Sequence, residues 1–467
     1  MTIFQDILTQ YDENLSGDSY IDPIGTLVIW SAFGQKIFNN RVNSISNDVR
    51  NYTLNLINHY LVRRLVMDES VVMSRRLSSV YGIKDEQFFK YACLLYLENL
   101  FTFSILKYES KLGVDIGGVL GNSKARRRWE ESKHNPSLIF THDKEGQILV
   151  RQLSLGVSGR YKTPLMEIGY FDAKYHYHQP KAADLWACTD EFVAEVPVLS
   201  HLVELAYVHL KWVLEQSSTT PKLLFSQVPE ELVDAFVSAF PSSTAVGRYA
   251  RRYWLQATGL DQGAAGALLT VLDEQATQDQ EVNIVPQRLL PYDLMDLAYR
   301  IATDADERTK IEHIQLLEPL LAESSLLFTL LTTKKTQSID AVIKEWERFG
   351  RNNGTLPRTS IRVCERSDLI KVVSGTAHRR LLALLRMAGQ PTIIDQITTL
   401  LAYHQDVMAG RGQLPWLTLD DAGVIKVNVR PSTPPDYDYW QSTPWVNSYY
   451  LPQFQRLVEG YQGREAS

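Results

Sequence analysis

The sequence predicts a mainly α-helical protein with short β-hairpins, an α+β fold, built from several modules. Its 467 residues exceed the length at which one hydrophobic core keeps growing, so we expect more than one domain. Apolar residues recur at helical spacing along most of the chain, and two pairs of strand-like runs are joined by turn-forming residues. With 45% apolar and 22% charged residues, the composition is that of an ordinary globular protein.

Helices dominate the first 130 residues. Asn47 and Asp48 can cap a predicted helix from about Val49 to Val66, in which apolar side chains recur on one face. The run from Gln87 to Lys107 is apolar on nearly every side, as expected for a helix at the centre of a module. A shorter helix is expected over residues 25–38, broken near Gly34.

A β-hairpin is expected after these helices. Residues 137–141 and 147–153 are strand-like, and the turn-forming residues 143–146 join them. Helices followed by a hairpin are typical of a winged-helix module. Many other small domains show the same order, so both interpretations of the N-terminal module stay open.

The sequence predicts three consecutive modules. The first is an N-terminal helical module with the hairpin (1–180). It is followed by an α-helical middle domain (181–350) and a helical C-terminal domain with a second hairpin and an aromatic tail (351–467). The second hairpin spans residues 416–429. Residues 261–280, rich in Gly, Ala and Gln, indicate a loop or flexible join.

The bulk sequence favours a cytoplasmic protein without a membrane span. The three cysteines are too few and too widely spaced for a disulfide framework or a zinc cluster, which indicates a reducing compartment. No uninterrupted apolar run approaches the roughly 18 residues that span a bilayer. The N-terminus lacks the basic and apolar regions of a secretory signal.

Charge is distributed unevenly. Residues 1–180 contain 21 Lys and Arg against 19 Asp and Glu, whereas the rest contains 27 against 35. The first part is therefore better suited to meet a polyanion, although nucleic-acid-binding domains are usually more basic.

The clearest functional signal is the basic strip, residues 117–129. It combines a glycine-rich turn with cationic and aromatic side chains: Lys124, Arg126, Arg127, Arg128 and Trp129. Glycines let backbone N–H groups approach an anion, cations neutralise phosphates, and an indole can stack on a base. The alternative is a solvated helix start whose arginines pair with Glu109, Glu130 or Glu131. The Gly-Lys-Ser/Thr ending of a Walker A loop is absent.

Arg160 and Lys162 are further candidates for contact with phosphate. They extend the basic face if the predicted hairpin folds back onto the strip, or else belong to an ordinary polar turn.

His176 and His178 stand at i and i+2, so on a strand both would face one side and could hold a metal ion with Asp172 or His201. Surface aromatic and histidine side chains are the alternative explanation. We expect no cofactor.

Three blocks of sequence carry a resemblance. They are Asp22–Gly25 through Arg50–Thr53, then Gly118–Arg126 with Arg160–Gly169, and last Tyr403–Trp416. In order and spacing they resemble a diverse set of bacterial proteins, often encoded beside helicases, ATPases or nucleases in anti-phage defence islands. That set carries a Thr-Arg-rich stretch where this chain has Ser44–Asp48.

The resemblance implies a genomic setting, and no catalytic residue comes with it. We therefore expect a non-catalytic, DNA-contacting or adaptor subunit of a bacterial anti-phage defence complex, with a helicase, ATPase or nuclease as protein partner. The alternatives are a divergent metal-dependent nuclease or toxic effector, and a scaffold that binds only protein.

Overall fold

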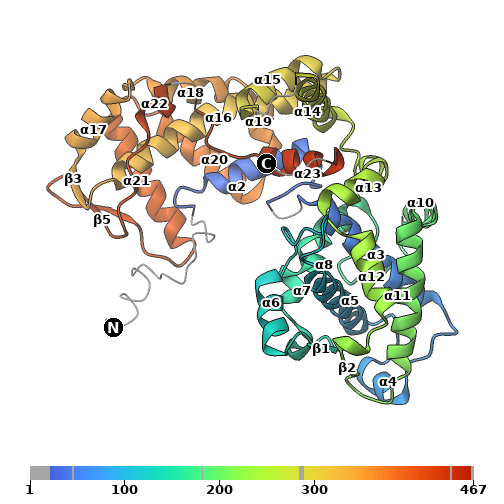
Figure 1. Ribbon diagram of the computed structural model, residues 1–467. Helices are drawn as coiled ribbons and strands as arrows, with labels where there is room; N and C mark the ends of the chain where they lie inside the picture. The colour runs from blue at the N-terminus through green and yellow to red at the C-terminus, as the bar shows by residue number, and fades with distance from the viewer. Residues whose placement is uncertain (1–21, 45–46, 181, 283–288, 442–443, 464–467) are drawn as a thin grey trace, which may run out of the picture. The chain divides into compact units, whose positions relative to one another are not determined.

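The computed structural model describes residues 22–44, 47–180, 182–282, 289–441 and 444–463 (Figure 1). Within these ranges there are 22 helices and five short strands, and 65% of the residues are helical. The strands pair antiparallel. The prediction of a mainly helical protein with a few short strands is therefore confirmed.

The chain forms two compact units, each assembled from two separate stretches. Unit 1 consists of Met1–Ile37 and Gln287–Leu451, and unit 2 of Phe38–Pro286 and Pro452–Ser467. The three consecutive modules expected from the sequence stay a prediction.

Unit 2 is built around α5 (Gln87–Lys107), which is buried along almost its whole length. Helices α3 (Val49–Met67), α6 (Asn122–Glu131) and α12 (Glu230–Ala239) pack against it. Asp48 caps α3 by accepting from the backbone N–H groups of Arg50 and Asn51, as its sequence predicts. The other helices of unit 2 are α4 (Arg75–Tyr81), α7 (Gln152–Leu155), α8 (Val157–Arg160), α9 (Lys162–Ile168), α10 (Ala182–Glu195), α11 (Pro197–Glu215), α13 (Ser243–Thr258), α14 (Gly263–Val282) and α23 (Leu451–Tyr461).

The predicted first hairpin is not formed. Strand β1 (Ser137–Ile139) pairs antiparallel with β2 (Lys222–Leu224) instead of with residues 147–153. The Gln152 Oε1 atom accepts hydrogen bonds from the backbone N–H groups of Ile148 and Leu149, at 2.7 and 3.3 Å. Because this side chain uses the donors that a strand ladder needs, the segment turns into α7. The hairpin that suggested a winged helix is thus absent from the described residues.

Residues 261–280, expected to form a loop or flexible join, instead form most of α14. Ala and Gln are good helix formers. Small residues also let the helix pack closely, since Ala264, Ala265 and Leu268 are buried.

Unit 1 is built around α16 (Ala305–Thr332), which packs against α2 (Thr26–Ile37), α15 (Pro291–Ile301), α17 (Ile339–Arg348), α18 (Thr355–Cys364) and α20 (Gly375–Ala388). The remaining helices are α19 (Ser367–Val372), α21 (Ile393–Ala409) and α22 (Tyr437–Gln441). Helix α2 runs unbroken through Gly34, contrary to the prediction. A Cβ at Gly34 would lie 2.6 Å from the Tyr449 carbonyl oxygen, so glycine allows the aromatic C-terminal segment to approach the helix.

The second predicted hairpin is confirmed. Strands β4 (Leu417–Leu419) and β5 (Val424–Val427) pair antiparallel, and β3 (Thr336–Ser338) joins on the other side of β5. The Asp420 carboxylate accepts from the backbone N–H groups of Ala422 and Val424, at 3.1 and 2.9 Å, which closes the turn.

Among the described residues, α16 alone is by itself long and apolar enough to cross a membrane, and α10 and α11 pass the same test only as a pair bent by 106°. In α16, 72% of the most apolar 18-residue stretch is buried inside the protein. This burial is typical of a core helix.

Candidate functional site

The basic strip forms the beginning and body of α6. Gly121 caps the helix in the left-handed region with φ of +84°, and a Cβ there would lie 2.9 Å from Leu149 Cγ. Glycine is needed for both reasons. Ala125 is fully buried on the inner side of the helix. The helix is thus fixed to unit 2 by one side and open to solvent on the other.

Three cations lie on the outer face of α6. Lys124, Arg127 and Arg128 are exposed and stand at i, i+3 and i+4, which share one side of a helix. Arg127 pairs with Glu131 at 2.8 Å, and the Arg128 Nη2 atom donates to the Gln147 carbonyl at 2.6 Å. Within the described part of the chain, the Lys124 side chain has neither an ion pair nor a hydrogen bond.

Arg126 and Trp129 face other parts of unit 2. Arg126 pairs with Glu109 at 2.6 Å. Two of the ion pairs expected under the solvated-helix alternative are therefore present. The Trp129 indole contacts the rings of Phe103, His134 and Phe225 at centroid distances of 6.1, 5.8 and 5.3 Å. These contacts anchor α6, so the indole is occupied in packing.

Arg160 and Lys162 lie on α8 and α9, and Lys162 contacts the segment that follows α9. The Lys162 Nζ atom donates to the Ala173 carbonyl at 2.6 Å and lies 4.4 Å from the centre of the Tyr175 ring. Burial lowers the pKa of Lys162, and the charge of Asp172 opposes this shift. Arg160 is half-buried at the end of α8. The contacts of Lys162 and those of the strip therefore go to different segments.

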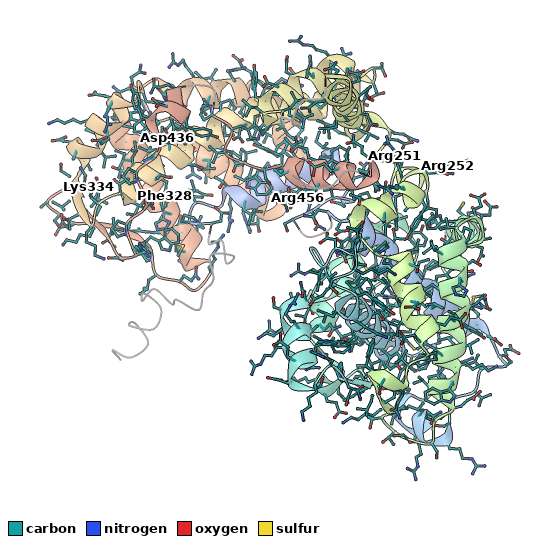
Figure 2. All side chains as sticks on the ribbon, viewed as in Figure 1. Arg251, Arg252, Phe328, Lys334, Asp436 and Arg456 are labelled. Atoms are coloured by element: carbon teal, nitrogen blue, oxygen red, sulfur yellow. The ribbon has the colours of Figure 1, made fainter. Side chains whose placement is uncertain are left out.

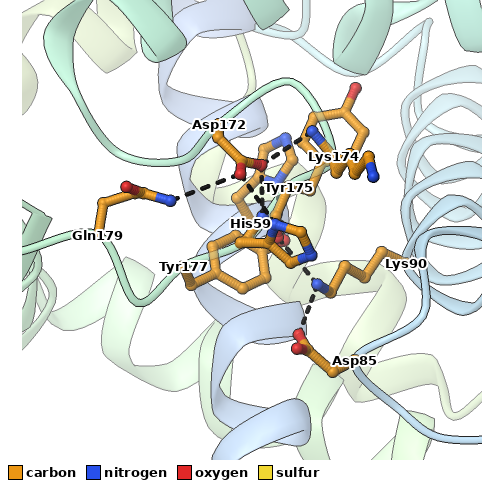
Figure 3. Close-up of polar contacts among 9 residues, drawn as sticks. His59, Asp85, Lys90, Asp172, Lys174, Tyr175, Tyr177 and Gln179 are labelled. Carbon is orange, nitrogen blue, oxygen red and sulfur yellow. Dashed lines mark hydrogen bonds and ion pairs between the residues drawn. The ribbon is translucent and has the colours of Figure 1, made fainter.

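The histidine pair does not lie on a strand. His176 and Asp172 are brought together, with 2.8 Å between Nδ1 and Oδ2, and Figure 3 labels Asp172. Burial opposes ionisation of Asp172, but hydrogen bonds, first among them those from His176, lower its pKa below the ordinary value. His178 is exposed, and His201 faces Glu231 at 3.8 Å. Among the described residues there is no group of three or more His, Cys, Asp and Glu side chains placed to hold a metal ion.

Sequence reasoning missed a buried polar cluster beside these residues. Lys90, fully buried on α5, donates to Asp85 at 2.6 Å and to the Tyr175 carbonyl at 2.9 Å (Figure 3). His59 on α3 shares a hydrogen bond of 2.9 Å with the Tyr177 hydroxyl. Burial, helped by nearby lysines, lowers the pKa of His59 to about 3, so its imidazole is neutral. In the sequence, the one sign of this cluster is that His59 stands among the apolar residues of α3.

The blocks that carry the resemblance meet in two places. In unit 2, the Asn51 side chain donates to the Gly118 carbonyl at 3.1 Å. In unit 1, His404 joins the first block to the last: its Nδ1 lies 2.8 Å from the Pro23 carbonyl, and its Nε2 accepts from the Trp416 backbone at 2.8 Å. The blocks thus contact one another within each unit.

The fold and these sites define a mainly helical protein of two units, with a basic surface helix and a buried polar cluster in unit 2. No protein-family model, curated protein or solved structure matches the chain significantly.

Proposed function

We propose that the chain is a non-catalytic, DNA-contacting adaptor subunit of a cytoplasmic bacterial anti-phage defence complex. The observation that carries the proposal is the outer face of α6, where Lys124, Arg127 and Arg128 are exposed side by side. The helix behind them is anchored by Ala125 and Trp129 and so needs no ordering on binding. The resemblance to proteins of defence islands supplies the biological setting, including a helicase, ATPase or nuclease as partner.

The existing partners of these cations leave them able to contact phosphate. The Arg127–Glu131 pair is exposed at both ends, with side-chain exposures of 72% and 60%. Such pairs contribute only about 0.2–1 kcal/mol, so exchange for phosphate costs little. Arg128 uses one of its five N–H donors on Gln147.

The proposed binding is weak, independent of sequence and sensitive to salt. Each phosphate neutralised contributes about −0.9 to the slope of log K against log salt concentration. Three cations therefore predict a slope of about −3. Fluorescence anisotropy of labelled duplex DNA between 50 and 200 mM salt measures both the affinity and this slope.

The test compares two triple variants of the full chain. K124A/R127A/R128A should abolish most of the binding and flatten the salt slope. The control, K334A/K335A/K344A, removes the same charge from exposed sites in unit 1, where Figure 2 labels Lys334. Equal affinity in the two variants would refute a DNA contact through α6. No binding by the unaltered chain would favour the protein-only scaffold.

A further inference from the structure

A second charged cluster lies in unit 1, around the buried carboxylate of Asp22. Asp22 is 1% exposed and accepts hydrogen bonds from the backbone N–H groups of Thr26 and Leu27, at 2.9 and 3.0 Å, at the start of α2. The Arg380 Nη1 and Arg411 Nη2 atoms lie 3.9 and 3.7 Å from the Asp22 Oδ2 atom. One carboxylate thus faces two guanidinium groups from different elements.

The two arginines are incompletely neutralised. The Asp22 carboxylate already serves the amides of α2, and both guanidinium distances exceed hydrogen-bonding range. Burial also raises the pKa of Asp22, against the opposing effect of its hydrogen bonds and the arginines. Partly buried cations normally have a full set of partners, because an unpaired charge in the interior is costly. The cluster therefore has an excess of positive charge.

Donors in this cluster also lack partners. The Tyr403 hydroxyl and the Arg380 Nη1 atom are buried, and neither has a hydrogen-bond partner among the described residues. Tyr403 is 8% exposed. Tyr403 stands on α21, which packs against α20, and the next residue, His404, holds the Pro23 carbonyl beside Asp22 at 2.8 Å. Burial raises the pKa of Tyr403. A buried hydroxyl without a partner is destabilising, because no hydrogen bond compensates for the water that it lost.

The two arginines lie at the edge of this cluster and are partly exposed. Arg380 lies against Gly25, where φ is +69° and a Cβ would come within 2.5 Å of Arg380 Cδ. Glycine therefore makes room for the arginine. The side chains of Arg380 and Arg411 are 15% and 27% exposed, so part of each arginine is in contact with solvent.

We propose that Arg380, Arg411 and Tyr403 bind the phosphate group of a small molecule. Guanidinium groups match phosphate oxygens with paired N–H donors, and a phenol adds one more donor. A phosphate has enough acceptor oxygens to serve all three side chains, and its charge balances the excess. The site lies in unit 1 and is independent of the DNA contact proposed for α6 in unit 2.

Calorimetric titration of the full chain tests the site with inorganic phosphate, AMP and glucose 6-phosphate as probes, at constant ionic strength. Phosphate alone binding as tightly as the two esters indicates free phosphate as the ligand. Tighter binding of an ester indicates a phosphorylated metabolite. Saturable binding of any of the three probes at one site per chain is expected.

Tyr403→Phe removes one oxygen atom and should weaken binding about tenfold or more, since hydrogen bonds to charged groups are among the stronger ones. Arg411→Met should weaken it further. Arg379→Met is the matched control, because Arg379 is exposed on α20 and donates to Thr376 instead. The proposal is overturned if no probe binds at 10 mM, or if Tyr403→Phe and Arg379→Met bind equally well.

Discussion

Ionisation of Glu318 should control how the aromatic C-terminal segment is held on unit 1. Glu318 is 2% exposed within α16. Its Oε1 atom accepts from the backbone N–H groups of Val446 and Asn447, at 2.5 and 3.0 Å, and its Oε2 atom accepts from the Asn447 side chain at 2.9 Å. Burial raises the pKa of Glu318 from 4.5 to about 7, although these hydrogen bonds act in the opposite direction.

The direction of the pH dependence of stability follows from which state, folded or unfolded, binds the Glu318 proton more tightly. In the folded protein Glu318 keeps its proton up to about pH 7, whereas in the unfolded chain it loses it near pH 4.5. Protonated Glu318 therefore contributes fully to the free energy of unfolding below pH 4.5, and this contribution is lost as the pH rises to about 7. A pKa difference of this size corresponds to about 3 kcal/mol.

Urea unfolding and hydrogen exchange of residues 444–451, both at pH 4.5 and pH 8, measure this loss. Glu318→Gln does not ionise, and rotation of the Asn447 amide would preserve the hydrogen bonds. The unaltered chain should lose about 3 kcal/mol more than the variant between the two pH values. Parallel pH profiles of the two proteins would refute the assignment.

Three substitutions in unit 2 should lower its free energy of unfolding in urea. Gly247→Ala places a methyl group against the Gly460 carbonyl and should cost about 1–3 kcal/mol; an unchanged midpoint would mean that α13 and α23 are not in contact. Asp48→Ala removes the cap of α3 and should cost about 1–2 kcal/mol, with Asp48→Asn, which keeps an acceptor, as the control. Asp85→Ala leaves the buried Lys90 ammonium without its carboxylate and should cost about 1–3 kcal/mol, a moderate loss because Asp85 itself is partly exposed. Adding Lys90→Met should restore part of this loss, and no restoration would mean that the ion pair does not stabilise unit 2.

Local signals in the sequence predicted the elements that local chemistry fixes. The Asp48 cap and the apolar run from Gln87 to Lys107 place α3 and α5 correctly. The turn at Asp420 places the second hairpin, because strand, turn and strand are adjacent in the chain. The expected ion pair of Arg127 with Glu131 also rests on a short separation, one turn of α6.

Long-range partners account for what the sequence could not predict. Strand β1 pairs with Lys222–Leu224 far along the chain, so its run of apolar residues suggested the wrong neighbour. Asp22 and Arg411 stand at opposite ends of the sequence, and neither has a distinctive local pattern. The sequence predicts that the Trp129 indole can stack on a base, and its packing against Phe225 could not be foreseen because Phe225 comes from a distant part of the chain.

The division of each unit between two stretches of chain determines when each can be completed during synthesis. Helix α2 is among the first described residues to leave the ribosome, yet its neighbours in unit 1 follow only after residue 286. Unit 2 is incomplete until α23 has been synthesised, because Phe454 of this helix packs on Phe38 with 4.8 Å between ring centres. Domains commonly fold one after another as they emerge. Here the last helix of unit 2 follows the second stretch of unit 1 in the chain, so part of the apolar surface of unit 2 stays uncovered while unit 1 is being synthesised.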